Sequence, residues 1–443
     1  MKEFFGEGLL LSTPEAEALY AGVKELPIVD YHCHLDENAI REDRGFSDIG
    51  ELWLAGDHYK WRAMRLCGVD EYYITGGADF HEKFLKYAEI FPKLCGNPLY
   101  YWTQMELKLL FDINEPLSAE SAERIYAMAN EKLKDMKVSD ILKRFKVEYI
   151  ATTDAESSDL ASHGTYGDTR VSPTFRPDSV LNMDLSAIAT LEGVVGYRLG
   201  TLADLKRALA ERLAYFVTKG CCIADHGMDF LPVTDCGEAA ASTLYENRAT
   251  LGTEEKQTLF SHLLYFLAPL YHKHGMAMQL HFATYRNVNS AAFPTVGRDA
   301  GFDIMRGEVN TDRLVEFLDV LQRKQALPKT VLYTLNPTCA PALATLSGAF
   351  PNVRVGAAWW FSDTVLGIRR QLETVAEYAA LGTNLGMLTD SRSFASYARF
   401  DFFRRILADT VGGYVARGEY DMNAAKALMY DVCYGNVKVF LNI

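Results

Sequence analysis

Two histidines separated by a single residue, His32 and His34, end an apolar run near the start of the chain. A β-strand repeats every two residues, so both imidazoles would point to the same side of it. Neighbouring neutral imidazoles are suitable ligands for Zn²⁺ and similar transition metals, although two such histidines can also be held by ordinary hydrogen bonds. Their place at the end of the first expected strand favours a metal site.

Three more polar side chains end later apolar runs. His281 and Asp390 end two of them, and with the first two histidines they could surround one cation and leave a position for water or substrate. His226 ends another run, where it could bind the metal, hydrogen-bond a substrate or simply pack. Lys219 lies at the opposite end of that run, where it cannot bridge two metals, and this favours a centre with one ion.

Arginines follow three of the expected strands, at Arg176, Arg286 and Arg392. The planar guanidinium group matches a carboxylate, so arginines that converge on one site of an acidic protein would attract a carboxylate anion. Each of them could instead form a salt bridge with a nearby Asp or Glu. Arg392 is the exception, because it lies two residues after Asp390 and can point into the same volume.

Aromatic and amphipathic stretches supply the remaining candidates. Trp359 and Trp360 end a run and are expected to form a wall of the substrate site. Asp363 and Asp154, which follow two expected strands, could each orient a ligand or begin the next element. The stretch GDHYKWRAMR has the pattern of an amphipathic helix with a solvated basic face. Alternatively, this helix brings a hydrogen-bond or proton donor to the site.

Apolar runs and helical patterns alternate along the chain. Eight apolar strands alternating with helices predict a parallel sheet closed into a (β/α)₈ TIM barrel, whose active site lies at the carboxyl ends of its strands. The alternative is an open doubly wound sheet, but the glycine-rich loop that usually follows its first strand is absent. The expected strands are residues 27–34, 147–153, 171–177, 221–226, 276–282, 330–335, 353–361 and 385–390.

The interval between the first two strands is too long for one crossover and is rich in helical patterns. We therefore expect a single barrel domain over residues 1–443, with a helical insertion at 37–145 that caps the barrel mouth. Residues 393–443 are expected to add a helical extension at the C-terminus.

Composition excludes several classes of partner. The 443 residues are 49% hydrophobic and carry a net charge of −13, which opposes nonspecific nucleic-acid binding. No apolar run approaches the roughly 20 residues of a membrane span, and the first residues lack the pattern of a signal peptide. Eight scattered cysteines without CxxC spacing indicate reduced thiols, so we expect a cytoplasmic protein. A chain this long can bury its core unaided, so a metal is expected to serve chemistry.

Six stretches together resemble uronate isomerase (glucuronate isomerase), a divergent family of the amidohydrolase superfamily, whose barrels are of the metal-dependent hydrolase type. The likeness covers nearly the whole chain, and GDHYKWRAMR and WWFSD are specific to the family, whereas HxH is shared across the superfamily. TTDAE stands where a TTDD-type sequence is common, which weakens the comparison at the second strand. The stretches are DYHCHL, GDHYKWRAMR, VEYIATTDAESSDLASH, TFRPD, AWWFSD and LTDSRSF.

The resemblance implies interconversion of D-glucuronate with D-fructuronate and of D-galacturonate with D-tagaturonate. It also implies one divalent metal, commonly zinc, held by the residues that match the family's ligands, His32, His34 and Asp390. The residues that match those assisting proton transfer or binding the substrate are Tyr59, Arg392, His58 and Arg176.

This chemistry moves a carbonyl from C1 to C2 through an enediol(ate), which requires a base and groups that stabilise negative charge. We expect Asp390 to act as the base, Tyr59 to handle the proton on the carbonyl oxygen and Arg392 to stabilise the developing charge. Arg176 would help to hold the C6 carboxylate of the substrate. The partner is thus a small hexuronate, and the size of the barrel suggests a homo-oligomer.

Other interpretations stay open. The same His and Asp residues could activate water in a mononuclear metal-dependent hydrolase, or the barrel could bind a uronate without turning it over. A hydride shift between C2 and C1 is an alternative mechanism, although it generally uses two metals. The sequence does not decide between glucuronate and galacturonate.

Overall fold

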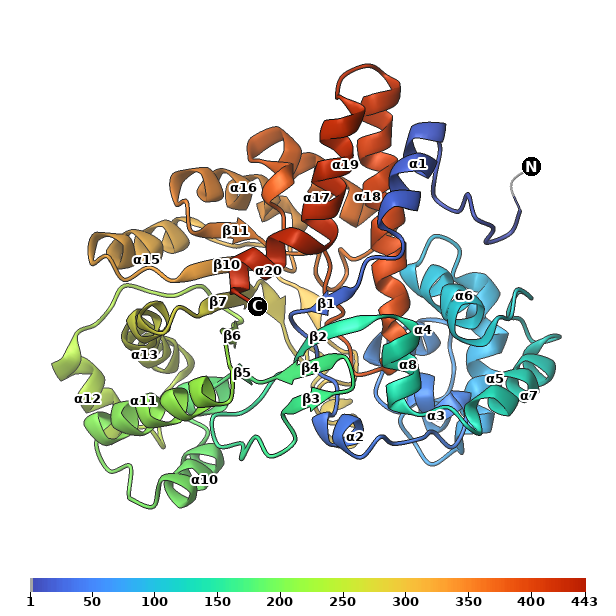
Figure 1. Cartoon of the computed structure of the whole chain (residues 1–443). Coiled ribbons are helices and arrows are strands. Elements are labelled where there is room, and N and C mark those ends of the chain that lie inside the picture. The colour runs from blue at the N-terminus through green and yellow to red at the C-terminus, as the bar shows by residue number, and fades with distance from the viewer. Residues whose placement is uncertain (1–2) are drawn as a thin grey trace.

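Short parallel strands form the centre of the molecule, and helices surround them (Figure 1). The computed structural model describes residues 3–443. The fold is α/β with a mostly parallel sheet, which confirms the predicted class. The parallel strands are β1 (Ile28–Asp30), β2 (Val147–Ala151), β4 (Thr169–Ser172), β5 (Thr174–Phe175), β6 (Ile223–Gly227), β7 (Ala277–Phe282), β10 (Lys329–Thr334) and β11 (Val353–Val355).

Strand pairing follows the chain order that a barrel requires. One sheet contains β1, β2 and β4, and the other contains β5, β6, β7, β10 and β11 in sequence. The two sheets meet at a parallel bridge between Asp154 and Phe175. The segment 385–390 then lies beside β1, because the backbone N–H of Asp390 donates to the carbonyl of His32 at 3.1 Å.

The segment 385–390 is not the strand that its apolar pattern predicted. Gly386 and Asp390 have φ angles of +72° and +45°, which lie outside the β region and interrupt a regular strand. Within residues 3–443 no backbone hydrogen bond joins this segment to β11. The indole N–H of Trp359, just beyond β11, instead donates to the Asp390 carboxylate at 2.6 Å. The closed barrel therefore remains our interpretation of this strand order.

Three short antiparallel strands were not predicted from the sequence. β3 (Gly164–Tyr166) pairs with β4, and β8 (Thr284–Tyr285) pairs with β9 (Ile304–Met305). These strands contain only two or three residues, which is too short to show a periodic pattern. The segment between β8 and β9 contributes to the pocket described below.

Helices follow most of the parallel strands. α11 (Leu202–Thr218) begins with a capping box, in which the Thr201 side chain accepts from the backbone N–H of Asp204. The helices between β5 and the segment 385–390 are α9 (Asp178–Leu181), α10 (Leu185–Val195), α11 (Leu202–Thr218), α12 (Glu238–Glu246), α13 (Thr253–Lys273), α14 (Phe293–Val296), α15 (Asp312–Arg323), α16 (Ala340–Ala349) and α17 (Val365–Tyr378).

Helices also fill the long interval between β1 and β2, and they gather on one side of the strands in Figure 1. They are α2 (Glu37–Arg41), α3 (Ile49–Leu54), α4 (His58–Leu66), α5 (Phe80–Ile90), α6 (Pro98–Phe111), α7 (Ala122–Leu133) and α8 (Val138–Arg144). The chain ends in α18 (Ala398–Ala416), α19 (Met422–Tyr430) and α20 (Asn436–Leu441), and α18 packs against α1 (Pro14–Val23). The division into a capping insertion at 37–145 and an extension at 393–443 remains a proposal.

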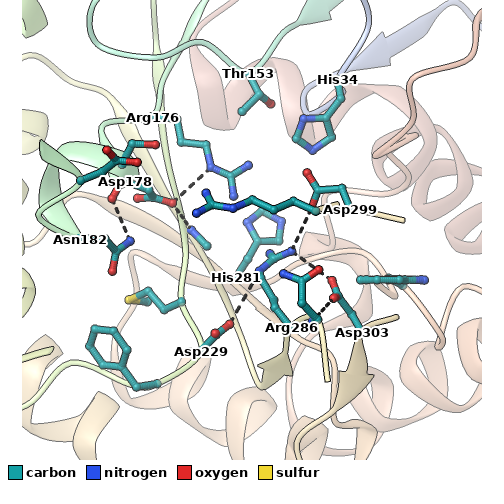
Figure 2. Close-up of a pocket in the computed structure, with 18 of the residues that line it drawn as sticks. His34, Thr153, Arg176, Asp178, Asn182, Asp229, His281, Arg286, Asp299 and Asp303 are labelled. Carbon is teal, nitrogen blue, oxygen red and sulfur yellow. Dashed lines mark hydrogen bonds and ion pairs between the residues drawn. The ribbon is translucent and has the colours of Figure 1, made fainter. Parts of the chain in front are cut away.

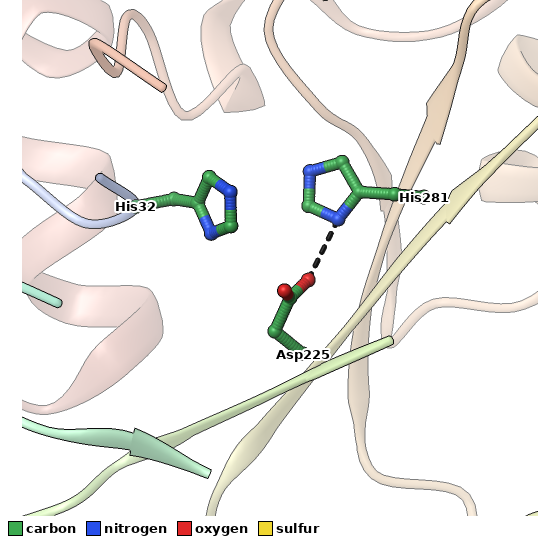
Figure 3. A group of neighbouring side chains, drawn as sticks. All are labelled: His32, Asp225 and His281. Atoms are coloured by element: carbon green, nitrogen blue, oxygen red, sulfur yellow. Dashed lines mark hydrogen bonds and ion pairs between the residues drawn. The ribbon is translucent and has the colours of Figure 1, made fainter. Parts of the chain in front are cut away.

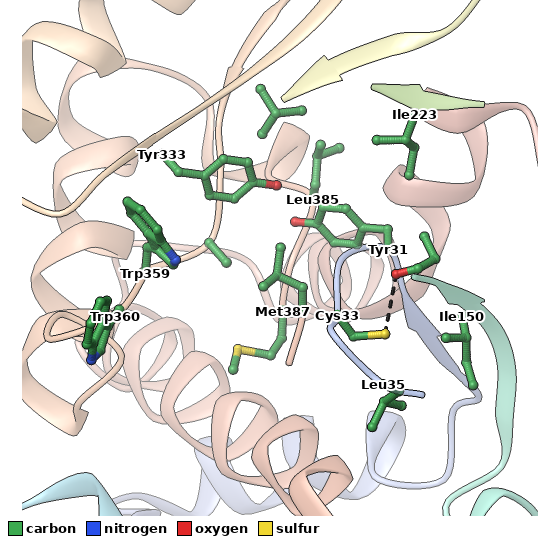
Figure 4. Close-up of a cluster of buried hydrophobic side chains, with 14 of the residues drawn as sticks. Tyr31, Cys33, Leu35, Ile150, Ile223, Tyr333, Trp359, Trp360, Leu385 and Met387 are labelled. Carbon is green, nitrogen blue, oxygen red and sulfur yellow. Dashed lines mark hydrogen bonds between the residues drawn. The ribbon is translucent and has the colours of Figure 1, made fainter. Parts of the chain in front are cut away.

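A buried cluster lies where β1, β10 and the segment 385–390 come together. Figure 4 shows Tyr31, Tyr333, Leu385 and Met387 converging there, and all four are buried. Burial of large apolar surface in this cluster stabilises the strands that carry the polar site. Among the described residues, no helix is long and apolar enough to cross a membrane.

Candidate active site

A cavity of about 1130 Å³ opens where the parallel strands end at their carboxyl termini (Figure 2). Of the candidates that the sequence pointed to, Tyr59, Asp154, His226 and Asp363 do not line it. The candidates that do line it are His32, His34, His58, Arg176, His281, Arg286, Trp359, Trp360, Asp390 and Arg392.

His32, His34 and Asp390 form the first group of possible metal ligands. The Nε2 atoms of His32 and His34 lie 3.2 Å and 3.1 Å from the same Asp390 oxygen, Oδ1. Burial disfavours a charged carboxylate, but hydrogen bonds from both histidines hold the pKa of Asp390 well below its usual range. Two imidazole nitrogens and an ionised carboxylate are a donor set that suits Zn²⁺ and related ions.

His281 and Asp225 form a second group with His32 (Figure 3). The Nδ1 atom of His281 lies 2.7 Å from Asp225 Oδ1, and the His281 and His32 rings are 4.6 Å apart. The Nε2 atom of His281 and the Nδ1 atom of His32 are buried and have no hydrogen-bond partner among the described residues. An Nδ1–H that donates to Asp225 leaves the Nε2 lone pair of His281 free, as a metal ligand requires. The residues present therefore fit a divalent cation.

Strand register explains why Asp225, which was not predicted, faces the site while His226 does not. In the parallel pair β6 and β7, Gly227 lies opposite His281 and Asp225 opposite Gln279, so these four residues share one face. His226 lies on the other face. The sequence shows the neighbouring pair Asp225–His226, but spacing alone does not say which of the two side chains faces the other ligands.

His226 is buried and engaged by protein groups on both ring nitrogens. Its Nδ1 lies 2.9 Å from Asp178 Oδ1, and its Nε2 lies 3.1 Å from the Tyr271 hydroxyl. The predicted contact of His226 with substrate is corrected accordingly, because no ring nitrogen is left to reach the cavity. His226 instead holds Asp178, which does line the cavity.

Arg176 connects the cavity wall to the second ligand group. Its Nε lies 3.2 Å from Asp178 Oδ2, and its Nη1 lies 3.3 Å from Asp225 Oδ2. The side chain points into the cavity in Figure 2. Arg176 thus forms salt bridges, as the sequence allowed, and it also offers guanidinium N–H groups to an anion.

Arg392 and Arg286 share a carboxylate of the cavity lining, that of Asp299. Arg392 Nη2 lies 3.2 Å from Asp299 Oδ2, and Arg286 Nη1 lies 3.9 Å from Asp299 Oδ1. Asp299 belongs to the segment between β8 and β9, which α4 holds through hydrogen bonds from Arg62 to the carbonyls of Gly301 and Asp303. No sequence pattern marked Asp299, because it lies in the loop between the single-turn helix α14 and the two-residue strand β9.

Trp359 and Trp360 form adjoining parts of the cavity wall. Trp359 donates to Asp390 and lies edge-on to His281, with the ring centres 4.7 Å apart. Trp360 meets His58 edge-on at 4.8 Å. Trp359 therefore also orients the carboxylate of Asp390.

His58 and Tyr59 begin α4, whose N-cap Asp57 accepts from the backbone N–H of Tyr59. Burial lowers the pKa of His58 to about 4, so its imidazole is neutral at neutral pH. The Tyr59 hydroxyl donates to Asp363 Oδ2 at 2.6 Å, next to the cavity rather than in its lining. Burial raises the pKa of Asp363 to about 6.

This chain is similar to known isomerases over nearly its whole length. A family model described as glucuronate isomerase matches residues 1–441. The chain is 41% identical to a uronate isomerase of Shouchella clausii, over 99% of this chain and 98% of that protein. It is 40% identical to a uronate isomerase of Histophilus somni, over 99% of each chain. A crystal structure of uronate isomerase from Thermotoga maritima superposes with a TM-score of 0.96 at 34% identity, covering 99% of this chain and 100% of that one.

Proposed function

The chain belongs to the glucuronate isomerase family, and from this membership we propose that it interconverts aldo- and keto-hexuronates, D-glucuronate with D-fructuronate and D-galacturonate with D-tagaturonate. The observation that carries the proposal is that an ionised carboxylate, Asp390, shares one cavity with two arginines, Arg176 and Arg392. A base and two anion-binding groups are what proton transfer on a uronate requires.

Asp390 is the proposed base. It takes the proton from C2 of the aldose, and the proton of the C2 hydroxyl passes to the C1 oxygen, which gives an enediolate. Asp390 then returns its proton to C1, and the C2 oxygen becomes the carbonyl of the ketose. The Nε2–H groups of His32 and His34 and the indole N–H of Trp359 donate to the carboxylate in this structure and hold it in place.

Arg392 stabilises the charge that develops on the reacting oxygens, and Arg176 binds the C6 carboxylate of the substrate. His58 lines the cavity as a neutral imidazole and is the α4 residue placed to hydrogen-bond the reacting oxygens. Tyr59 donates to Asp363 outside the lining, so we assign it a positioning role instead of the direct role that the sequence suggested.

The divalent ion is proposed to be Zn²⁺, held by His32, His34 and Asp390, with His281 as a further ligand. Such an ion would supply positive charge next to the substrate oxygens. We also propose a cytoplasmic homo-oligomer. The eight cysteines, all of which are free thiols, fit a reducing compartment.

Turnover in D₂O tests the proton-transfer mechanism. After many turnovers we expect deuterium at C1 of the ketose and C2 of the aldose, because a carboxyl proton on Asp390 exchanges with solvent in an open cavity. Mass spectrometry and proton NMR of the sugars measure the label. Substrate kept in D₂O without the enzyme is the control, and strict retention of protium would establish a hydride shift instead.

Replacement of Asp299 by asparagine tests how substrate reaches Arg392. Asp299 neutralises Arg392 and Arg286 at the cavity, so a uronate carboxylate or enediolate must compete with it. An exposed ion pair is worth up to about 1 kcal/mol, and the substrate no longer has to break it in D299N. We therefore expect the KM for uronate to fall about threefold to fivefold.

Asp319→Asn, which breaks an exposed ion pair with Arg323 on α15, is the matched control and should leave KM unchanged. An unchanged or higher KM in D299N would show that Asp299 does not compete with the substrate.

The hydrolase alternative is not favoured, because activation of water needs neither Arg176 nor Arg392 in the cavity. A coupled assay that reduces the keto product, run beside a panel of esters and amides, separates the two activities.

A further inference from the structure

A third group of possible metal ligands lies outside the cavity lining, where the segment before α12 meets α13. It consists of Asp235 and Cys236, which precede α12, and His262 on α13. One ligand atom from each residue lies within 4.8 Å of the others. His262 Nδ1 is 2.6 Å from Asp235 Oδ1, and His262 Nε2 is 3.4 Å from Glu238 Oε2.

We propose that Asp235, Cys236 and His262 bind a divalent transition-metal ion of the zinc class, separate from the ion of the active site. A thiolate, an imidazole nitrogen and a carboxylate oxygen are the donors that zinc prefers. Glu238, whose carboxylate faces the other ring nitrogen of His262, supplies the outer hydrogen bond that metal-bound histidines usually make.

Lys206 on α11 sets the affinity of this site. Its Nζ lies 2.8 Å from His262 Nε2 and also contacts Glu238. Lysine only donates, so in the metal-free protein Nε2 accepts from Lys206 and Nδ1 carries the proton that faces Asp235. A metal on Nδ1 moves the proton to Nε2, where it donates to Glu238, and Lys206 must withdraw from the ring. The ammonium group therefore competes with the ion.

The ion would connect the segment after β6 to α13. Met228, Asp229 and Phe230 at the start of that segment line the active-site cavity, and Asp235 and Cys236 lie at its end. A metal bridge to His262, which is buried in α13, would hold this wall of the cavity against the helix.

Cobalt(II) titration of the full-length protein tests the site. We expect a thiolate-to-cobalt charge-transfer band, because Cys236 is a ligand here, whereas the ligand groups of the cavity contain no thiol. The Cys236→Ser variant should lose the band and bind one ion fewer, while its isomerase activity persists. Cys95→Ser, at an exposed cysteine, is the matched control and should keep the band.

Lys206→Met gives a second, independent readout. Removing the competing ammonium should raise cobalt affinity at this site about tenfold, an effect of the size seen for groups around metal ligands. A salt-bridge network without metal function predicts no band in any variant. Absence of a band that depends on Cys236, or an unchanged affinity in K206M, would overturn the proposal.

Discussion

Replacement of Asp390 by asparagine is expected to lower kcat by about 10³-fold or more. The amide keeps the shape of the carboxylate but cannot take a proton from carbon. It also removes the negative charge that both imidazoles and the Trp359 indole surround. The measurement is the rate of keto-product formation, followed by its reduction in a coupled assay.

Two effects must be separated in D390N, because Asp390 is both the proposed base and a proposed ligand. Metal content measured on the same samples shows whether the ion is retained, and thermal unfolding shows whether the fold is intact. Asp319→Asn makes the same change of functional group at an exposed side chain of α15, and this variant should keep full activity. A D390N enzyme that keeps its metal and turns over within tenfold of the native rate would show that another group is the base.

Periodic patterns predicted the elements that depend on burial. The buried strands β6, β7 and β10 appear where their apolar runs indicated, at residues 221–226, 276–282 and 330–335. Hydrophobic burial is encoded locally, so a single sequence suffices for such elements. The segment 385–390 was misassigned because its left-handed residues are set by contacts with β1 and by Trp359, which are distant in sequence.

The sequence predicted which of the proposed ligands lie together, but it predicted fewer of the residues that hydrogen-bond or pair with the site. His32, His34, His281 and Asp390 lie together because strand ends are neighbours in an α/β sheet, whatever separates them along the chain. Asp225 and Asp299 were missed for different reasons. The first depends on which face of β6 points inward, and the second lies in an irregular segment that α4 holds in place. Neither register nor tertiary hydrogen bonds can be read from spacing.

The carboxylates that pair with Arg176 and Arg392 determine how freely each arginine can bind the substrate. Arg176 lies between two carboxylates, Asp178 and Asp225, whereas Arg392 is partly exposed and pairs only with the exposed Asp299 among the ion pairs of the described residues. The first arginine is therefore fixed in place before the substrate arrives. The second can exchange its carboxylate partner for a negatively charged substrate oxygen, which makes it the better reporter of transition-state charge.

Replacement of Arg392 by methionine is expected to lower kcat by about 10²–10³-fold, the usual cost of removing a group that stabilises developing negative charge. Methionine keeps much of the length of the side chain, and within residues 3–443 the substitution breaks one exposed ion pair, with Asp299, so stability should change little. Steady-state kinetics of the forward and reverse reactions measure the effect, because one enediolate serves both directions and both rates should fall together.

Arg298→Met is the matched control for this variant. Arg298 is an exposed arginine of the same cavity lining with no assigned part in the reaction, so its loss lowers the positive charge around the substrate by the same amount. We expect R298M to change KM modestly and to keep kcat, and Arg392→Lys to recover part of the lost rate because the charge returns without the planar fork. If R392M and R298M affect only KM, and to the same degree, then Arg392 attracts the substrate and does not stabilise the enediolate.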